Sequence, residues 1–184
     1  MVRREQVPLI ITLSSLSSLG VGLLGPVYSI FVLNRFSASI LDVGMLATVF
    51  GLVSAFFKTL AGKLVDAYGE KKVFFVGVML GALCSLSYIL AFELTHLYLI
   101  EFFFGIAYAL QGPARLALIM NNIGGRRKRG LILGIFETTY DVAGSLAAII
   151  AAVIASNFGF EVIFFACSCC QIVTALLVLK SRNI

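Results

Sequence analysis

Two acidic residues in the fifth apolar run, Glu137 and Asp141, are the side chains of this sequence best suited to chemistry. They are four positions apart, so both lie on one face if the run is helical. A carboxylate inside a membrane span costs roughly 2.5–3.5 kcal/mol on insertion scales, and it usually faces a cavity or a partner. Two such acids on one face suit the binding and release of a proton.

An arginine and a glutamine in the preceding run complement these acids. If the fourth and fifth runs form an antiparallel hairpin centred near Arg126, reflection about that centre pairs Arg115 with Glu137. The same reflection pairs Gln111 with Asp141. The resulting polar seam has two interpretations, which stay open here. It is either a charge-satisfied staple between two helices or a substrate and proton site that lines a central cavity.

Two further ionisable residues, Lys58 and Glu101, also fall within apolar runs. Lys58 lies about six residues before the expected end of its run, where a long side chain can snorkel to the lipid headgroups. A role in a site is the alternative. Glu101 lies roughly one helical turn inside the opposite surface. It either reaches water there or serves as an entry point for a cation or a proton.

Long apolar runs must carry all of these side chains. The 184-residue chain is 60% hydrophobic and 12% charged, with a mean hydropathy of +1.05, whereas a soluble domain is about 25% charged. A helix of about 20 apolar residues crosses the hydrocarbon of a bilayer. The sequence therefore predicts an all-α integral membrane protein, with one six-helix transmembrane domain over residues 1–184. The spans are expected at about 8–33, 40–64, 73–92, 97–120, 130–155 and 162–179.

Lysine and arginine are distributed unevenly between the two expected ends of these spans. Only Arg35 falls on one side, whereas most of the fourteen fall on the other. By the positive-inside rule the basic side is the cytoplasm, so both termini are expected there, in a multi-pass protein of the cell membrane. The basic side holds Arg3, Arg4, Lys63, Lys71, Lys72, Arg126, Arg127, Lys128, Arg129, Lys180 and Arg182.

These basic residues sit in short loops and form no continuous face, which argues against nucleic-acid binding. The run Arg126–Arg129 is interpreted as a topology signal in contact with lipid headgroups. Four cysteines, at positions 84, 167, 169 and 170, fall inside apolar runs, and we expect buried thiols that pack between helices. Their spacing predicts neither a metal site nor a disulfide framework. Without a nucleotide-binding loop, a histidine cluster or a Ser-His-Asp set, the sequence predicts no enzyme and no cofactor.

A weak internal repeat relates the two halves of the chain. Gly25-Pro26 interrupts the first span, and Gly112-Pro113 interrupts the fourth. Tyr68-Gly69 and Phe158-Gly159 each precede an aromatic start of the next span, one expected in the cytoplasm and the other outside. Three spans followed by three with inverted topology, each with a Gly/Pro break, are typical of transporters that bind substrate near the midplane.

The charged turn between the second and third runs carries a known pattern. Residues 62–73 read GKLVDAYGEKKV. This segment resembles the signature loop of the major facilitator superfamily of secondary transporters, with matches at Gly62, Leu64, Asp66, Gly69, Lys71 and Lys72. Ala67 and Glu70 stand where that family often has basic residues. The resemblance implies a gating role for Asp66, through contacts with the opposite six-helix half, and capping of a helix is the alternative.

The resemblance extends over nearly the whole chain. Arg126–Gly144 is similar to the family's entry into its fifth span. The family's arginine near the outer end of the fourth span is replaced here by Glu101, four residues before Gly105, so the proton-handling role of that arginine is not carried over. Gly144-Ser145 also lacks the proline of the antiporter motif. The chain thus resembles one N-terminal-type half of a major facilitator fold, a three-plus-three inverted repeat.

The expected function is secondary active transport of a small solute by alternating access, with proton coupling as an option. In that mechanism two six-helix bundles rock about a central site. The resemblance therefore implies a homodimer, a second six-helix half, or a longer carrier of which this chain is a fragment. The alternative is a non-transporting membrane scaffold or a degenerate half-transporter, which would not need solvent-accessible Glu137 and Asp141.

Overall fold

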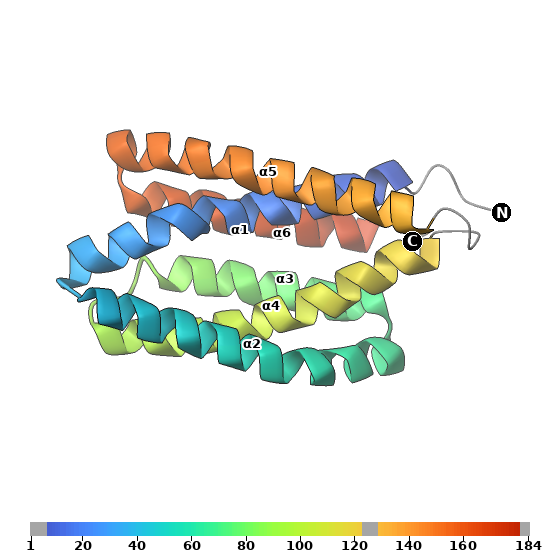
Figure 1. Ribbon diagram of the computed structural model, residues 1–184, viewed down its shortest axis with the longest axis horizontal. Helices are drawn as coiled ribbons and strands as arrows, with labels where there is room; N and C mark the ends of the chain where they lie inside the picture. Colours follow the sequence, from blue (N-terminus) through green and yellow to red (C-terminus); the bar gives the residue numbers. More distant parts are fainter. Residues whose placement is uncertain (1–6, 123–128, 181–184) are drawn as a thin grey trace.

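The computed structural model of the chain describes residues 7–122 and 129–180. Six α-helices make up almost all of these residues (Figure 1). They are α1 (Val7–Phe36), α2 (Ile40–Tyr68), α3 (Glu70–Ser87), α4 (Leu94–Asn122), α5 (Arg129–Phe158) and α6 (Phe160–Lys180). The all-helical prediction is confirmed, and each expected span corresponds to one helix.

Five of these helices are long and apolar enough to cross a membrane, among the residues that the structure describes. The exception is α3, which has 18 residues and carries Glu70, Lys71 and Lys72 in its first turn. The sequence predicts this span at about 73–92, but α3 begins and ends earlier. It begins earlier because charged residues can continue a helix beyond its apolar run. It ends earlier because Tyr88–Leu90 form a turn.

Single glycines join two of the antiparallel helix pairs. Gly69, between α2 and α3, has φ +88°, and Gly159, between α5 and α6, has φ +86°. Their amides donate to the carbonyl oxygens of Val65, at 2.9 Å, and Ala155, at 3.2 Å. Positive φ is accessible to glycine without the steric cost that a Cβ brings. These two positions therefore reverse the chain within one residue.

The start of α2 is fixed by a reciprocal cap. The Asp42 amide donates to Ser39 Oγ at 3.2 Å, and the Ser39 amide donates to Asp42 Oδ2 at 2.8 Å. Such a capping box satisfies two amides that a helix start leaves without partners, and an N-cap serine is worth about 0.5–2 kcal/mol. The cap separates α2 from α1 across the short connection that follows Phe36.

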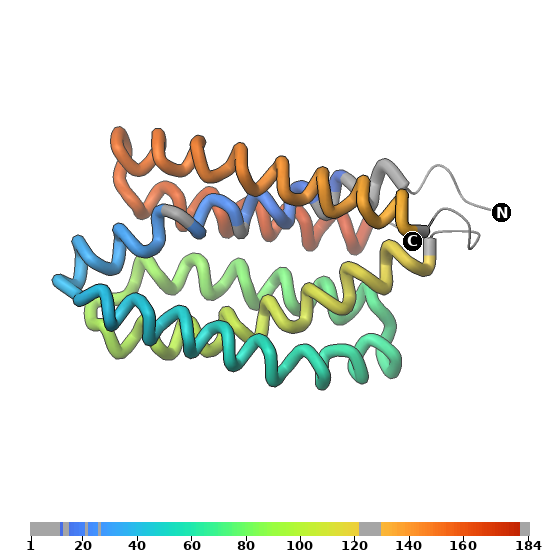
Figure 2. The backbone as a smooth tube through the Cα atoms, in the orientation of Figure 1, coloured from blue at the N-terminus to red at the C-terminus, as the bar shows by residue number. Residues whose placement is uncertain are grey.

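The helices form two groups of three. α1 packs against α5 and α6, α4 packs against α2 and α3, and contacts between α3 and α6 join the groups. In Figure 1, α5 and α2 lie at opposite edges of the bundle, and Figure 2 shows the same antiparallel course of the backbone. The centre of the face between these edges is therefore formed by α1 and α4.

One end of the bundle gathers the basic residues of the described chain. α1 begins, α6 ends, and the Gly69 turn lies at the same end, at the right in Figure 1. Lys71 and Lys72 follow that turn, whereas Arg35 lies near the end of α1 at the opposite end, where it pairs with Glu161 at 3.0 Å. Arg3, Arg4, Arg126, Arg127, Lys128 and Arg182 lie outside the described residues.

The Gly-Pro pairs do not break their helices, contrary to the sequence expectation. α1 runs without interruption through Gly25-Pro26, and α4 runs through Gly112-Pro113. A proline inside a helix removes one backbone hydrogen bond. Within a membrane bundle, neighbouring helices and side chains can compensate for that loss, so the helix continues.

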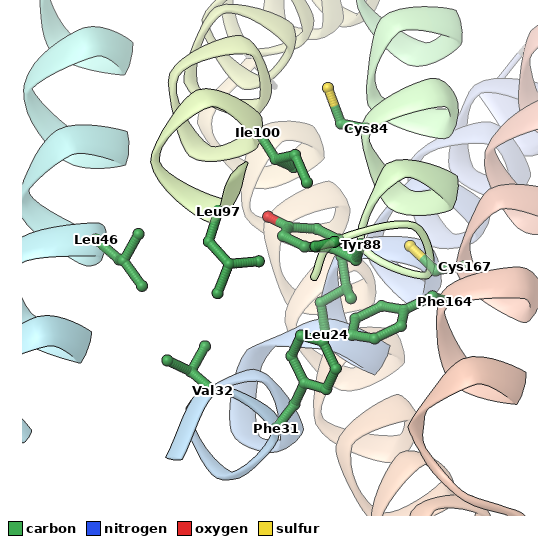
Figure 3. Close-up of a cluster of buried hydrophobic side chains, with 11 residues drawn as sticks. Leu24, Phe31, Val32, Leu46, Cys84, Tyr88, Leu97, Ile100, Phe164 and Cys167 are labelled. Carbon is green, nitrogen blue, oxygen red and sulfur yellow. The ribbon is translucent and has the colours of Figure 1, made fainter. Parts of the chain in front are cut away.

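Apolar clusters fill both ends of the bundle, a third lies between α1, α5 and α6, and a polar layer separates the first two. The first cluster, around Phe31, Tyr88 and Phe164, holds the end opposite the basic residues (Figure 3). The second, around Phe74 and Leu118, holds the basic end. The layer between contains Gln111 and Gln171: Gln111 Nε2 donates to the Gly77 carbonyl oxygen at 3.0 Å, and Gln171 Nε2 donates to Ser85 Oγ at 3.3 Å.

A close approach of α1 and α5 depends on small residues. A Cβ added at Gly22 would lie 2.7 Å from Gly144 Cα, too close for any side chain. The sequence suggests a packing ladder of Gly144, Ala148 and Ala152. In the structure Ala152 is exposed, and the buried residues that follow Gly144 are Ala147 and Ala151. The ladder prediction is therefore wrong for Ala152.

The cysteines differ in burial more than the sequence suggests. Cys84 and Cys167 are buried, Cys170 is partly buried and Cys169 is exposed, so the expectation of packing between helices is wrong for Cys169. All four thiols are free. Cys167 Sγ donates to the Gly20 carbonyl oxygen at 2.7 Å and so joins α6 to α1. This thiol belongs to the polar layer as well as to the core.

Candidate functional site

A hollow of approximately 260 Å³ lies where α4 faces α1, α2 and α5. Its wall combines two cations, two tyrosines and several uncharged polar groups within an otherwise apolar bundle. α4 contributes most of this wall because Tyr108, Gln111 and Arg115 recur at helical spacing on one face. The lining residues are Ser17, Lys58, Phe74, Tyr108, Gln111, Gly112, Pro113, Arg115, Leu116 and Tyr140. We call this space the Arg115 hollow.

Arg115 joins α4 to α5 inside this hollow. Its Nη2 atom lies 3.6 Å from Glu137 Oε1, so the pairing predicted from the hairpin is present. The guanidinium carbon lies 3.8 Å from the centre of the Tyr140 ring. The ion-pair distance exceeds the 2.7–2.9 Å of a strong charge-assisted hydrogen bond, and Arg115 Nε is buried without a hydrogen-bond partner. Arg115 therefore has donor capacity that the protein leaves unused.

Lys58 is exposed on α2, and its side chain lies against Tyr108 of α4. Its Nζ atom lies 5.3 Å from the centre of the Tyr108 ring, and the residue lines the Arg115 hollow. Snorkelling and a role in a site therefore both remain predictions for Lys58. The sequence places the end of this span near Leu64, whereas α2 continues to Tyr68, so Lys58 lies ten residues before the end of the helix. The ammonium group also gains a cation–π contact with Tyr108.

Gln111 has partners other than the one predicted. Its Oε1 accepts a hydrogen bond from Ser17 Oγ at 3.3 Å, and its Nε2 donates to the Gly77 carbonyl oxygen. No hydrogen bond joins it to Asp141 within residues 7–122 and 129–180. The expected Gln111–Asp141 pair is thus absent, because Gln111 faces α1 and α3 while Asp141 is exposed on α5.

Asp141 borders a second hollow, of approximately 420 Å³, between α1 and α5. Ser18, Gly22 and Gly144 also line this space, and Tyr140 borders both this hollow and the Arg115 hollow. The two spaces are therefore neighbours, separated by one aromatic side chain. Glu137 and Asp141 share a face of α5 as predicted, but only Glu137 contacts Arg115.

Glu101 is buried, contrary to the expectation that it reaches water. Only 5% of the residue is exposed, and its Oε1 accepts a hydrogen bond from Tyr88 Oη at 2.8 Å. A third hollow, of approximately 200 Å³, lies beside it and is also lined by Tyr28 and Phe50. The expectation of water contact fails because Tyr88, in the turn after α3, donates a hydrogen bond to the carboxylate and helps to bury it.

The signature turn lies apart from these hollows. Gly62 and Asp66 belong to α2, and Lys71 and Lys72 belong to the first turn of α3 on the other side of Gly69. Asp66 is exposed in the last turn of α2. The dipole of α2 places partial negative charge at that end, so it repels the carboxylate and does not favour a capping role within α2. None of the five glycine and charged residues that match the signature lines the hollows beside Arg115, Asp141 or Glu101. These residues are Gly62, Asp66, Gly69, Lys71 and Lys72.

Sequence reasoning missed three polar residues of the Arg115 hollow, namely Ser17, Tyr108 and Tyr140. A signal for Tyr108 was present, since it precedes Arg115 by seven positions and Gln111 by three, which places it on the same face of α4. Ser17 and Tyr140 carried no such signal, because serine and tyrosine are common inside membrane helices and only the packing of α1 and α5 shows which way they face.

The arrangement suits a small solute with a carboxylate and several hydroxyl groups. Arginine and carboxylate form paired, charge-assisted hydrogen bonds, and the unused donor of Arg115 is available for one. Gln111 and Ser17 add uncharged polar groups, and the ring of Tyr140 adds an apolar surface. The hollow has the mixed apolar and polar lining that ligand pockets typically show.

Comparison with known proteins decides which family has this fold. The profile described as Major Facilitator Superfamily matches residues 10–183. The chain belongs to the major facilitator superfamily. Members of this superfamily are membrane transporters and not enzymes, so those two predictions are confirmed.

A curated relative is named for one class of solute. This major facilitator chain is 27% identical over 136 residues to a protein named "Hexuronate transporter" from Bacillus subtilis (strain 168). The match covers 73% of this chain and 32% of that protein. The aligned region thus corresponds to about a third of the relative's length.

Proposed function

We propose that this major facilitator chain takes part in the secondary active transport of a small sugar acid, with the Arg115 hollow as its part of the solute site. The observation that carries the proposal is Arg115 itself, which lies inside a hollow at the centre of a transporter fold with a buried donor unused. A charged residue at membrane depth without a full set of partners is a functional site by default.

The sugar-acid class rests on two independent supports. A hexuronate carries one carboxylate and several hydroxyl groups, which match the guanidinium and the uncharged polar groups of the hollow. The relative from Bacillus subtilis is named for hexuronates. Because that protein is much longer than the aligned region, the solute class is proposed here and not transferred.

A second six-helix bundle is the next part of the proposal. The hollows beside Arg115 and Asp141 open at the surface of this bundle, so one bundle supplies only one wall of an enclosed site. We propose that a second copy of this chain, or a separate second half, supplies the opposite wall, and that the two bundles rock to give alternating access. Asp66 of the signature turn would then meet the second bundle and stabilise one of the two states.

An inverted repeat of α1–α3 and α4–α6 is proposed for the bundle itself. Two features support it. The turns at Gly69 and Gly159 have nearly equal φ values and the same type of amide hydrogen bond. The packing is also reciprocal, because α1 packs against α5 and α6 as α4 packs against α2 and α3. With the basic end in the cytoplasm, both termini would lie on the cytoplasmic side of the cell membrane.

Proton coupling is proposed through the two acids of α5, Asp141 and Glu137. Asp141 is exposed on α5 beside the second hollow, and Glu137 lies next to it on the same face. Either acid could take up a proton as the solute enters. Uptake driven by a pH gradient should therefore be lost in Asp141→Asn or Glu137→Gln, while exchange without a gradient persists. Unchanged pH-driven uptake in both variants would remove this coupling.

Solute exchange in vesicles tests the proposal as a whole. The full chain, reconstituted into phosphatidylcholine vesicles preloaded with galacturonate or glucuronate, should accumulate labelled uronate by counterflow. Vesicles without protein and vesicles with Arg115→Gln are the controls, and neither should exceed the background. Galactose should not exchange at a comparable rate.

The same vesicles distinguish the carrier from the alternative of a membrane scaffold. A scaffold would give no counterflow of any uronate, although the protein remains folded and helical in the vesicles. A detergent-solubilised mass that fits only a monomer, together with no counterflow, would also remove the homodimer.

A further inference from the structure

We infer that Lys58 determines the charge preference of the solute site, because it supplies the second cation for the carboxylate that Arg115 binds. The inference rests on the proposed function and deepens it. It names the residue by which the site would distinguish a sugar acid from a neutral molecule of the same shape.

Lys58 of α2 and Arg115 of α4 line the hollow at the same face of α4. Lys58 Nζ lies 5.3 Å from the centre of the Tyr108 ring, and Tyr108 is seven positions before Arg115 on α4. Seven residues are about two helical turns, so the side chains of Tyr108 and Arg115 lie one above the other on that face. Both cations line the same hollow. A small anion between them could contact both.

The charge of the hollow is not balanced by the protein. Glu137 provides the counter-charge of Arg115, at 3.6 Å, but it is not among the residues that line the space. No aspartate or glutamate of the described chain forms an ion pair with Lys58, and no acid lines the hollow. One positive charge without a counter-charge from the protein therefore borders this open hollow at membrane depth, where such a charge is costly. An anionic solute would offset that cost.

The depth of Lys58 argues against a purely interfacial role. α2 continues for ten residues beyond Lys58, from Thr59 to Tyr68, which at 1.5 Å per residue is about 15 Å of helix. A lysine that only contacts headgroups has no reason to lie over an aromatic ring of another helix. The aromatic face of Tyr108 holds the ammonium group in place without neutralising its charge.

A comparison of an acid with its ester tests the inference. Galacturonate and its methyl ester have nearly the same shape, but only the acid is charged. Their affinities are measured by competition against labelled galacturonate in counterflow, with the full chain in phosphatidylcholine vesicles, which contain no anionic lipid. The variants are Lys58→Met, Lys58→Arg and, as the matched control, Lys63→Met, which removes an exposed lysine of the same helix outside the hollow.

The wild-type chain should prefer the acid to the ester. Lys58→Met should weaken the affinity for the acid by roughly 10- to 100-fold, as expected for the loss of one charged hydrogen bond, while the ester changes by less than about twofold. Lys58→Arg should keep most of the preference, and Lys63→Met should keep all of it.

Three outcomes would overturn the inference. An equal loss of affinity for acid and ester in Lys58→Met would mean that Lys58 only maintains the structure. An unchanged preference would mean that Arg115 alone selects the charge. If the wild-type chain binds neither compound, the proposed function falls and the inference falls with it, whereas the first two outcomes leave the proposed function intact.

Discussion

The guanidinium group of Arg115 lies against the ring of Tyr140, with 3.8 Å between the guanidinium carbon and the ring centre. The contact joins α4 to α5 at the point where the hollow beside Arg115 meets the hollow beside Asp141. The ring orients the cation, and the weak pairing with Glu137 leaves donors free. Tyr140 is therefore the residue on which the position of Arg115 most depends.

Substitution of Tyr140 should separate the role of the ring from that of the hydroxyl group. Tyr140→Leu should weaken uronate affinity by roughly 2- to 30-fold, because a cation–π contact is worth about 0.5–2 kcal/mol, depending on how far it is desolvated. Tyr140→Phe keeps the ring and should change the affinity by less than about twofold. Half-saturation of uronate counterflow measures both. Equal losses in the two variants would show that the hydroxyl group matters and the ring does not.

Glu137→Gln should strengthen the binding of the anion. The glutamate competes with the solute for Arg115 across 3.6 Å, and its side chain is 45% exposed, so the pair is only weakly coupled. Partly exposed pairs are worth at most about 1 kcal/mol, which corresponds to an increase in uronate affinity of up to about fivefold. The measurement is uronate affinity at one pH with no gradient. A loss of affinity would instead indicate that Glu137 contacts the solute.

The six helices and the Arg115–Glu137 pair could be predicted from the sequence. The length of an apolar run determines whether it can span a membrane, and the centre of a hairpin determines which residues of its two arms lie at the same height. Both quantities depend only on distance along the chain. The signature turn was equally accessible, because it is a contiguous pattern of charges and glycines at Gly62–Lys72.

The directions in which Lys58, Gln111 and Glu101 point could not be predicted in this way. In a soluble helix the apolar stripe shows which side faces the core. Lipid is as apolar as the interior of a bundle, so a membrane helix lacks this stripe and its rotation stays undetermined. Glu101 is covered by Tyr88 from a turn, and Lys58 meets Tyr108 of another helix. Both facts depend on packing between helices.

The buried carboxylate of Glu101 should make Tyr88 important for stability. Tyr88→Phe removes the hydrogen bond to Glu101 Oε1 and leaves a buried polar group without that donor. The expected loss is about 1–3 kcal/mol in the free energy of unfolding. Thermal unfolding in detergent measures it. Tyr88→Phe combined with Glu101→Leu should recover part of the loss, and a double variant less stable than Tyr88→Phe alone would contradict this explanation.

The close approach of α1 and α5 predicts a second stability effect. Gly22→Ala would place a Cβ 2.7 Å from Gly144 Cα, so the two helices must separate, and the midpoint of thermal unfolding should fall. Gly25→Ala on the same helix is the matched control, because nothing lies within 4 Å of its added Cβ. It should be neutral or slightly stabilising, since alanine favours the helix over glycine by up to about 1 kcal/mol. Equal shifts in both variants would argue against a tight contact at Gly22.

Water access to the Arg115 hollow tests the carrier hypothesis most directly. Gly112 lines this hollow, and nothing lies within 4 Å of a Cβ added there, so Gly112→Cys introduces a thiol without a clash. The background is a chain whose four native cysteines are replaced, and Leu83→Cys, at an exposed apolar position of α3, is the control.

The measurement is the rate at which a membrane-impermeant thiol reagent modifies each variant in vesicles, with and without galacturonate. The carrier hypothesis predicts rapid modification of Gly112→Cys that galacturonate slows severalfold, and little modification of Leu83→Cys under either condition. Modification of Gly112→Cys no faster than that of Leu83→Cys, or a rate that galacturonate leaves unchanged, would contradict it.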